Sequence, residues 1–267
     1  MSPPTDANQD AKPAPAAGAS AATAGHERVA VLLAGGLGSR LAPFTAIIPK
    51  PLVPIDGRVS IAEVLLRQLS AAGFRKIFVS IGYLGHLIRA VLGSGEQFGV
   101  EIEYVSEDKP LGTVGPLHLI ADRLPDRFLL LNGDVLTDLD FAALHQAHRA
   151  SDATLMVSVF PRNVRVDLGV LDTDEGGQVT AFREKPTYDF LVSMGVYAMH
   201  KRVLGHIPSD RPFGFDDLMY AMLASGDPVR TFNWSHGRWL DIGRHEDFAT
   251  AQRLFVDERH HYLPDGD

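Results

Sequence analysis

The sequence predicts an α/β protein whose sheet is mostly parallel and doubly wound. Two observations predict this fold class. Short apolar segments alternate with longer segments whose apolar residues recur at helical spacing, which is the pattern of repeated strand–helix units. In addition, a glycine-rich turn follows the first apolar segment, 29–33, and such a turn lets the backbone approach a phosphate group.

The first half of the sequence is expected to alternate regularly between strands and helices. Segment 61–72 has apolar residues at positions 61, 64, 65, 69 and 72, the spacing of one helix face. Segment 128–131 is apolar throughout, which is typical of a strand buried in a parallel sheet. The expected strands are 29–33, 77–81, 102–105, 128–131 and 154–159. The expected helices are 61–72, 84–92, 114–121 and 139–150.

The second half contains strand-like segments with fewer helices between them. This pattern favours a mixed extension of the sheet, or a small lobe rich in strands, built on the same core. A last helix is expected over 245–259. The strand-like segments are 170–172, 179–184, 192–199 and 229–232.

Length and composition indicate a disordered tail, 1–25, followed by one ordered domain, 26–267. At about 150 residues per domain, 267 residues allow one or two domains. The tail holds nine Ala and four Pro and almost nothing to bury. Neither a signal peptide before Val29 nor a membrane span is recognisable, so a cytoplasmic enzyme without a membrane partner is expected.

Composition also excludes several classes of site. The absence of cysteine rules out disulfides, cysteine zinc sites, iron–sulfur clusters and thiol nucleophiles. With 25 Lys and Arg against 33 Asp and Glu, the formal charge is −8, which argues against nucleic acid as a partner. A few placed cations and backbone N–H groups can still hold a phosphate on an acidic protein.

The glycine-rich turn is the strongest local signal. It is not a P-loop, because no Gly-Lys-Ser/Thr follows at the required spacing. It also fails as a dinucleotide-binding fingerprint, because Leu41 stands at the third glycine and Pro49 and Pro51 cannot continue a helix. Two cations, Arg40 and Lys50, follow the turn and suit a triphosphate.

The segment from Leu33 to Leu52 resembles the signature of the sugar-1-phosphate nucleotidyltransferases, also called nucleotide-sugar pyrophosphorylases. The family more often has Thr at the position of Ser39, and both side chains supply a hydroxyl. The resemblance covers about 29–255. It implies a Rossmann-like fold of the nucleotide-diphospho-sugar transferase type, with a small β-rich extension that binds the sugar. The nucleotide-binding residues it implies are Leu33, Ala34, Gly35, Gly36, Gly38, Ser39, Arg40, Lys50, Gly112 and Asp134.

Two separated aspartates are candidates for a divalent cation. Asp134 comes just after the expected strand 128–131, and Asp241 lies in the strand-like segment 239–243. Ligands of open α/β sheets bind at the carboxyl ends of strands, so two such acids can converge. Mg²⁺ takes one or two carboxylates together with phosphate oxygens and water. Both segments resemble the family's metal-binding aspartates, which implies a Mg²⁺ cofactor.

The sugar-phosphate side is indicated by the segment Phe182-Arg183-Glu184-Lys185-Pro186, which resembles the family's Glu-Lys-Pro element. The resemblance implies that Glu184 accepts hydrogen bonds from sugar hydroxyls and that Lys185 pairs with the sugar phosphate. Gly169 and Gly195 match glycines whose backbone faces the sugar in the family. A β-bulge glycine is the alternative for either position.

Segment 107–115 resembles the loop that reads the nucleobase in this family. Gly112 would let the backbone lie against the edge of the base. The form of the loop resembles that of guanylyltransferases more than that of short thymidylyltransferases, so GTP is favoured. Long thymidylyltransferases and some uridylyltransferases have related loops, so dTTP and UTP stay open.

The reaction that the resemblance implies joins an NTP to a sugar 1-phosphate, giving an NDP-sugar and pyrophosphate, with a manno-configured hexose or heptose favoured. Arg40 and Lys50 would neutralise the triphosphate, and Lys185 would align the nucleophile. Relatives are commonly homodimers or homotetramers.

The alternatives are a thymidylyl- or uridylyltransferase on another sugar, a cytidylyltransferase on a polyol phosphate, and a non-catalytic nucleotide-sugar-binding protein. A nicotinamide-dependent dehydrogenase is disfavoured by the missing third glycine.

His145 and His148 are spaced as a metal pair would be on a helix. No third ligand is evident, so a solvated helix face is the preferred interpretation.

Overall fold

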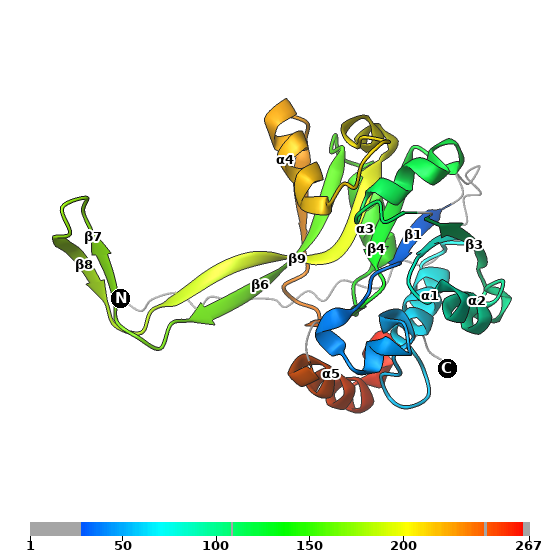
Figure 1. Ribbon diagram of the computed structural model, residues 1–267, viewed down its shortest axis with the longest axis horizontal. Helices are drawn as coiled ribbons and strands as arrows, with labels where there is room; N and C mark the ends of the chain where they lie inside the picture. The colour runs from blue at the N-terminus through cyan, green and yellow to red at the C-terminus, as the bar shows by residue number, and fades with distance from the viewer. Residues whose placement is uncertain (1–27, 108, 243–244, 264–267) are drawn as a thin grey trace, which may run out of the picture.

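The computed structural model of the chain describes residues 28–107, 109–242 and 245–263, without the side chains of Arg40, Asp241 and residues 245–247. The body is a seven-stranded sheet with helices packed on it, and a two-stranded arm projects from one side of this body (Figure 1). The expected disordered tail, 1–25, lies outside the described residues.

The main sheet is mixed and mostly parallel, as the sequence predicts. Its strands are β1 (Val29–Ala34), β2 (Lys76–Ile81), β3 (Glu101–Ser106), β4 (Arg127–Asn132), β6 (Leu155–Arg165), β9 (Thr187–His200) and β10 (Val229–Asn233). Their order is β10-β6-β9-β4-β1-β2-β3, and β9 runs antiparallel to both of its neighbours. From β3 the chain returns to the other side of β1 to form β4, and such a reversal opens a crevice at the carboxyl ends of the strands.

Each face of the sheet is buried under its own hydrophobic layer, because successive strand residues point to opposite faces. In β1, Ala30, Leu32 and Ala34 belong to one layer, and Val29 and Val31 belong to the other. The first layer includes residues of α1 (Ile61–Ala71), α2 (Gly85–Leu92), α3 (Phe141–Arg149), α5 (His245–Asp257) and α6 (Arg259–Tyr262). The second includes residues of α4 (Phe215–Ser225) and of the 3-10 segments η5 (Gly115–Arg123) and η6 (Lys201–His206).

The start of α1 shows how the sequence sets a helix boundary. The Ser60 hydroxyl accepts a hydrogen bond from the backbone N–H of Glu63 at 3.3 Å, and the Glu63 carboxylate accepts one from the backbone N–H of Ser60 at 2.7 Å. This reciprocal capping box satisfies two N–H groups that have no partner within the helix. It fixes the helix start at Ile61, where the sequence predicts it.

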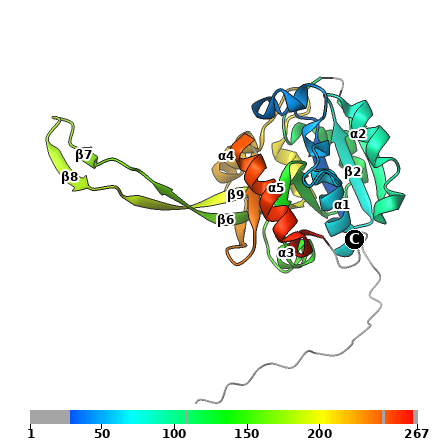
Figure 2. The ribbon, with the colours of Figure 1, turned by 90° about the horizontal axis from the view of Figure 1, so that it is seen from below.

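The arm is formed where β6 and β9 continue past the edge of the body as a two-stranded ribbon. The ribbon ends in a small hairpin of β7 (Val170–Thr173) and β8 (Val179–Arg183). Figures 1 and 2, two views at right angles, both show the arm projecting from the body, with β7 and β8 farthest from it. The β-rich extension that the sequence predicts is therefore present, as a projecting arm.

The elements that differ from the prediction include η5 and α4. Segment 114–121, expected as a helix, forms the 3-10 segment η5, the tighter winding that short connecting segments often adopt. Helix α4 was not predicted, although its sequence carries signals for it. Asp216 and Asp217 lie in its first turn, Gly226 follows its end with φ +75°, and buried Leu218 and Met222 stand four residues apart.

The interpretation of His145 and His148 as a solvated face was wrong. Both rings are buried, with exposed fractions of 5% and 0%. The His148 ring donates from Nε2 to the carbonyl of Ala153 at 3.0 Å, and Arg127 lies 3.3 Å from its Nδ1. Burial, reinforced by nearby arginines, lowers the pKa of each ring to about 4. Both histidines are therefore neutral parts of the core.

A second short sheet, besides that of β7 and β8, joins β5 (Val135–Thr137) to β11 (Trp239–Asp241) in antiparallel register. None of the described helices combines the length and apolar composition that a membrane span requires.

Buried neutral histidines should make the protein acid-sensitive. In the unfolded chain each ring takes up a proton near pH 6.5, whereas in the folded chain its pKa is about 4. The unfolded chain therefore binds more protons than the folded chain between these pH values. The free energy of unfolding falls as the pH drops from about 6.5 toward 4, by roughly 1 kcal/mol per pH unit for each histidine. Urea unfolding at pH 7.5, 6 and 5 measures this loss.

The matched variant is His148→Gln, because an amide can donate to Ala153 and accept from Arg127 without titrating. Below pH 6.5 the wild type should lose stability faster than this variant. Parallel loss in both proteins would show that His148 does not titrate on unfolding in this range.

Candidate functional site

The largest candidate site is a cleft of about 750 Å³ at the carboxyl ends of the parallel strands. Each of β1, β2, β3 and β4 contributes residues at or just after its end, as expected for ligand sites in open α/β sheets. The lining includes Leu33, Ala34, Gly35, Gly36, Gly38, Ser39, Lys50, Ser80, Gly82, Tyr83, Glu107, Gly112, Thr113, Asn132, Gly133 and Asp134. Nine of the ten residues expected to bind nucleotide are among them.

The glycine-rich turn is held against the segment that carries Lys50. Gly38 has φ +60°, and a Cβ there would lie 3.0 Å from the Thr45 methyl group and 3.1 Å from Cβ of Lys50. The Thr45 hydroxyl donates a hydrogen bond to the Gly38 carbonyl at 2.8 Å. The turn and Lys50 are thus fixed to one another, although Lys50 follows the turn by more than ten residues in the sequence.

The remaining residue expected to bind nucleotide is Arg40. It lies in the 3-10 segment η1 (Ser39–Leu41), directly after the cleft-lining residues Gly38 and Ser39. Its side chain falls outside the described part of the structure.

Lys50 and Asp134 form an ion pair inside the cleft. The Lys50 side chain is 9% exposed and that of Asp134 is 30% exposed. Their elements are brought together by the pairing of β1 with β4, which is extended when the Gly133 N–H donates to the Leu33 carbonyl at 2.8 Å. A cation and a carboxylate that the sequence analysis assigned separately therefore meet at one point.

The loop after β3 is braced from two sides. The Glu107 carboxylate accepts hydrogen bonds from the Ser80 hydroxyl at 3.1 Å and from the backbone N–H of Leu111 at 2.8 Å. On the other side, the backbone of Phe213 bonds to both Leu111 and Val114. Gly112 has φ +80°, and a Cβ there would lie 2.5 Å from the Phe213 carbonyl oxygen. Glycine is therefore required where the sequence predicts contact with a base.

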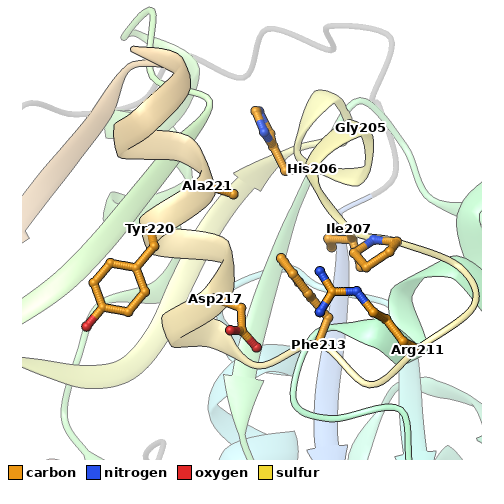
Figure 3. Close-up of a pocket in the computed structure, with 9 residues that line it drawn as sticks. Gly205, His206, Ile207, Arg211, Phe213, Asp217, Tyr220 and Ala221 are labelled. Carbon is orange, nitrogen blue, oxygen red and sulfur yellow. The ribbon is translucent and has the colours of Figure 1, made fainter.

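Phe213 also borders a second hollow, of about 480 Å³, shown in Figure 3. The Arg211 guanidinium lies 5.3 Å from the centre of the Phe213 ring, and Asp217 and Tyr220 of α4 lie along the opposite wall. No residue predicted from the sequence lines this hollow. Phe213 belongs to the lining of this hollow and also holds the loop that carries Gly112. The hollow shares no lining residue with the larger cleft.

A smaller cleft, of about 360 Å³, adjoins the first and shares Asn132 and Asp134 with it. Its lining includes Arg162, Ser193, Gly195 and Trp239, together with Val135, Val192, Met194 and Leu240. Gly195 packs against the Asn132 amide, which a Cβ on Gly195 would approach to 2.7 Å. Asn132 and Asp134 thus stand on the boundary between two binding spaces.

Asp241 reaches this boundary through the short β5–β11 sheet. Its backbone pairs with that of Val135, the residue after Asp134. The Trp239 indole N–H donates to the Met194 carbonyl at 3.0 Å and so fixes β11 to β9. The side chain of Asp241 is not among those described, so the structure places its backbone only.

The charge of Asp134 acts on a buried aromatic side chain, Tyr197, whose hydroxyl accepts a hydrogen bond from the Ser193 hydroxyl at 3.2 Å. The Tyr197 ring is buried and stacks on Phe215 with ring centres 3.9 Å apart. Burial raises the pKa of Tyr197, a hydrogen bond from Ser193 opposes this, and the charge of Asp134 adds to the rise. Tyr197 is therefore a neutral phenol at ordinary pH.

Gly169, Glu184 and Lys185 are not brought to either cleft. They lie together on the arm, where its ribbon joins the β7–β8 hairpin, and Gly169 faces the Phe182 ring and the Glu184 carboxylate. Lys185 is exposed and has φ +45°, an unusual conformation for a residue other than glycine. Sequence motifs single out these residues, but the motifs do not show that the arm places them away from both clefts.

The donor set at the boundary fits a magnesium ion. Asp134 offers carboxylate oxygens, and the backbone of Asp241 runs next to it. Among the described residues no cluster of three or more His, Cys, Asp or Glu forms a complete protein-made metal site. Mg²⁺ needs only one or two carboxylates when phosphate oxygens and water supply the rest, so the chemistry of the Asp134 carboxylate is compatible with such a site.

Sequence reasoning missed several cleft residues, among them Asn132, Glu107 and Arg162. Asn132 ends β4, and Glu107 begins the base loop, so both stood in segments whose neighbours were identified. A polar residue at the end of an apolar strand is the signal that could have found Asn132. No comparable signal existed for Arg162, because its place depends on the pairing of β6 with β9.

The nucleotidyl transferase family model matches residues 29–258. Among curated proteins, a UTP–glucose-1-phosphate uridylyltransferase of Synechocystis sp. is 33% identical over 243 residues, covering 84% of this chain and 62% of that protein. A mannose-1-phosphate guanylyltransferase of Mycobacterium tuberculosis is 34% identical over 236 residues, covering 86% of this chain and 65% of that protein. The chain thus spans less than two thirds of the length of these relatives.

Among solved structures, HddC from Yersinia pseudotuberculosis matches with a TM-score of 0.67 and 27% identity, covering 85% of this chain and 99% of that chain. HddC complexed with GMP-PN matches with a TM-score of 0.64 and 25% identity, with the same coverage. The expected nucleotide-diphospho-sugar transferase type of fold is confirmed.

The Lys50–Asp134 pair should appear as coupling in a double-mutant cycle. Asp134→Ala should lower the free energy of unfolding by roughly 1–3 kcal/mol, because the buried ammonium of Lys50 loses its partner. Adding Lys50→Met should restore part of this loss. Urea unfolding of all four proteins at pH 7 measures the coupling. Strictly additive effects would show that the two groups do not interact.

Gly112→Ala should disturb the base loop, because its methyl group would collide with the Phe213 carbonyl. We expect GTP binding, measured by titration calorimetry with Mg²⁺, to weaken by about tenfold or more. Gly57→Ala is the matched control, since Gly57 has φ +78° but no atom within 4 Å of a Cβ. Equal GTP affinity in the two variants would contradict a role for the loop in nucleotide binding.

Proposed function

The chain belongs to the nucleotidyl transferase family, and from this premise we propose that it is a sugar-1-phosphate nucleotidyltransferase. It transfers a nucleoside monophosphate from an NTP to a sugar 1-phosphate and releases pyrophosphate. The observation that carries this proposal is the pair of adjoining clefts that share Asn132 and Asp134. One cleft takes the nucleotide, the other takes the sugar phosphate, and the reacting phosphates meet at their boundary.

The chemical step needs positioning and charge neutralisation more than proton transfer. A sugar phosphate oxygen is already anionic near neutral pH, so it attacks the α-phosphorus without a general base, and the bond to the β-phosphate breaks. Lys50 lies at the boundary and neutralises the α-phosphate and the leaving pyrophosphate, assisted by Arg40. The glycine-rich turn presents backbone N–H groups to the triphosphate.

Asp134 and Asp241 would hold Mg²⁺. When bound, the ion neutralises charge on the two substrates' phosphates. In the free protein Asp134 pairs with Lys50, so substrate binding exchanges this ion pair for contacts with phosphate and metal. The Asp134 carboxylate thus keeps Lys50 in place before the substrates arrive.

GTP is the nucleotide that we propose as preferred. The braced loop around Gly112 supports it, as does similarity to a mannose-1-phosphate guanylyltransferase and to HddC, solved with GMP-PN. Similarity to a glucose-1-phosphate uridylyltransferase favours UTP as the alternative. For the sugar, we propose a manno-configured hexose or heptose 1-phosphate. Because the proposed reaction consumes an NTP, we expect the protein to act in the cytoplasm, where NTPs are made.

Pyrophosphate release tests the proposal. The protein is incubated with Mg²⁺, with GTP, dTTP, UTP, CTP or ATP in turn, and with a panel of sugar 1-phosphates. We expect release with GTP and a manno-configured sugar. Release with UTP or dTTP would keep the reaction and replace the base assignment. Nucleotide binding without release for any sugar would favour a non-catalytic nucleotide-sugar-binding protein.

Asp134→Asn should reduce the rate of release by about 10²–10³-fold, since it removes a charge at the reacting phosphates. Asp257→Asn is the matched control, because Asp257 is exposed at the end of α5, apart from the lining of either cleft. Near-full activity of Asp134→Asn in Mg²⁺ would overturn the metal assignment.

A further inference from the structure

The arm carries chemistry that its own body does not use. Glu184 and Lys185 are exposed where its ribbon joins the β7–β8 hairpin, and Gly169 lies beside Glu184. In the described part of the chain, the hydrogen bonds and ion pairs of residues 163–190 join residues of this segment to one another. Examples are Asn163 with Asp189, and Arg183 with Asp172.

The ribbon is long enough to keep this junction away from the body. Its pairing is unbroken from Val159–Ser193 to Arg165–Thr187. Ser193 lines the smaller cleft. Thr187, the first residue of β9, precedes Ser193 by six residues and lies about 20 Å farther from the body in an extended strand. Lys185 precedes Thr187 by two more residues, so its side chain cannot reach the cleft of its own body while the ribbon is paired.

The arm also exposes apolar surface that a free ribbon would not be expected to keep. Two-stranded hairpins are marginally stable in water when nothing covers them. Large apolar side chains of the arm are 44–73% exposed, namely those of Val164, Leu168, Leu171, Val179, Phe182, Phe190 and Leu191. A second group of exposed apolar residues, Leu37, Ile47, Ile48 and Tyr83, lies at or next to the mouth of the larger cleft.

The described lining of the smaller cleft carries little positive charge. Among the described residues that line it, Arg162 is the one cation, and Asp134 brings a negative charge. A sugar phosphate carries negative charge and needs more than this to bind. The described lining of the cleft offers Arg162 alone to a phosphate, and the arm holds a further, exposed cation, Lys185.

We propose that the arm of one copy completes the smaller cleft of a second copy, and that the exchange is reciprocal in a symmetric dimer. Glu184 and Lys185 then act in the partner's site, where Lys185 meets the phosphate and Glu184 meets hydroxyls of the sugar. The exchange buries the apolar side chains of both arms against the partner. This inference deepens the proposed function and rests on it for the identity of the ligand.

Reciprocal exchange is favoured over folding of the arm onto its own body. Folding back would break the continuous β6–β9 ladder or bend it sharply next to the cleft, whereas exchange keeps every pair of the ladder. Two arms and two clefts also close on each other by a twofold axis, which limits the assembly to a dimer.

Cross-linking tests the exchange without any substrate. Because the chain has no cysteine of its own, a bismaleimide reacts only with the cysteines that are introduced. Thr187→Cys marks the arm and Ser193→Cys marks the cleft. After co-refolding the two variants together, a short bismaleimide should give a covalent dimer in the mixture, beyond any formed by either variant alone. Val91→Cys, exposed on α2, replaces Ser193→Cys in the control and should give none.

The doubly substituted chain, with cysteines at 187 and 193, decides between the two arrangements. Covalent dimers support exchange. A link confined to single chains would show that the arm folds back, and it would overturn the inference. A monomer by sedimentation at micromolar concentration, with no intermolecular link, would overturn it as well. Neither result depends on the proposed reaction.

Complementation adds the functional readout. Lys185→Ala has a defective arm, and Asp134→Asn has a defective cleft. If sites form between copies, half of the dimers in an equal mixture are mixed, and each has one intact site, so about a quarter of wild-type activity returns. Activity no higher than the mean of the two variants, while the wild type is active, would contradict exchange and leave the proposed function standing. Dimers cross-linked by exchange, with an inactive wild type, would contradict the proposed function instead.

Discussion

The ion pair between Lys50 and Asp134 is the interaction on which the site depends. It exists because β1 and β4 pair in parallel and end side by side, so that the turn after one faces the aspartate after the other. The pair also marks the boundary of two clefts, since Asp134 lines both and Lys50 lines the larger. The pairing of two neighbouring strands thus places this ion pair at the point where we propose that the nucleotide and the sugar phosphate meet.

The body and the arm differ in how much apolar surface they bury. The body buries both faces of its sheet under separate hydrophobic layers, and this rigidity keeps the cleft residues fixed relative to one another. The arm has no core of its own and exposes large apolar side chains along its length. A segment of this kind gains stability by packing against another surface, so the proposed exchange between copies accounts for its apolar surface and for its exposed Glu184 and Lys185 together.

Much of the fold was predictable, because strands buried in a parallel sheet are strongly apolar and because Ser60 and Glu63 mark a helix start. The residues that line the larger cleft were predictable in part, since Gly35, Lys50 and Asp134 stand in short, specific motifs. Long-range pairing was not. The direction of the arm depends on how far β6 and β9 remain paired, and the burial of His145 and His148 depends on which helix face meets the core. Neither is encoded in local spacing.

A crystal structure of the protein with Mg²⁺, a non-hydrolysable GTP analogue and mannose 1-phosphate would test the central claim most directly. The account predicts that the α-phosphate and the sugar phosphate lie next to each other at Asn132 and Asp134, within contact distance of Lys50. Nucleotide bound in the hollow behind Phe213, or phosphates bound away from Asp134, would contradict it.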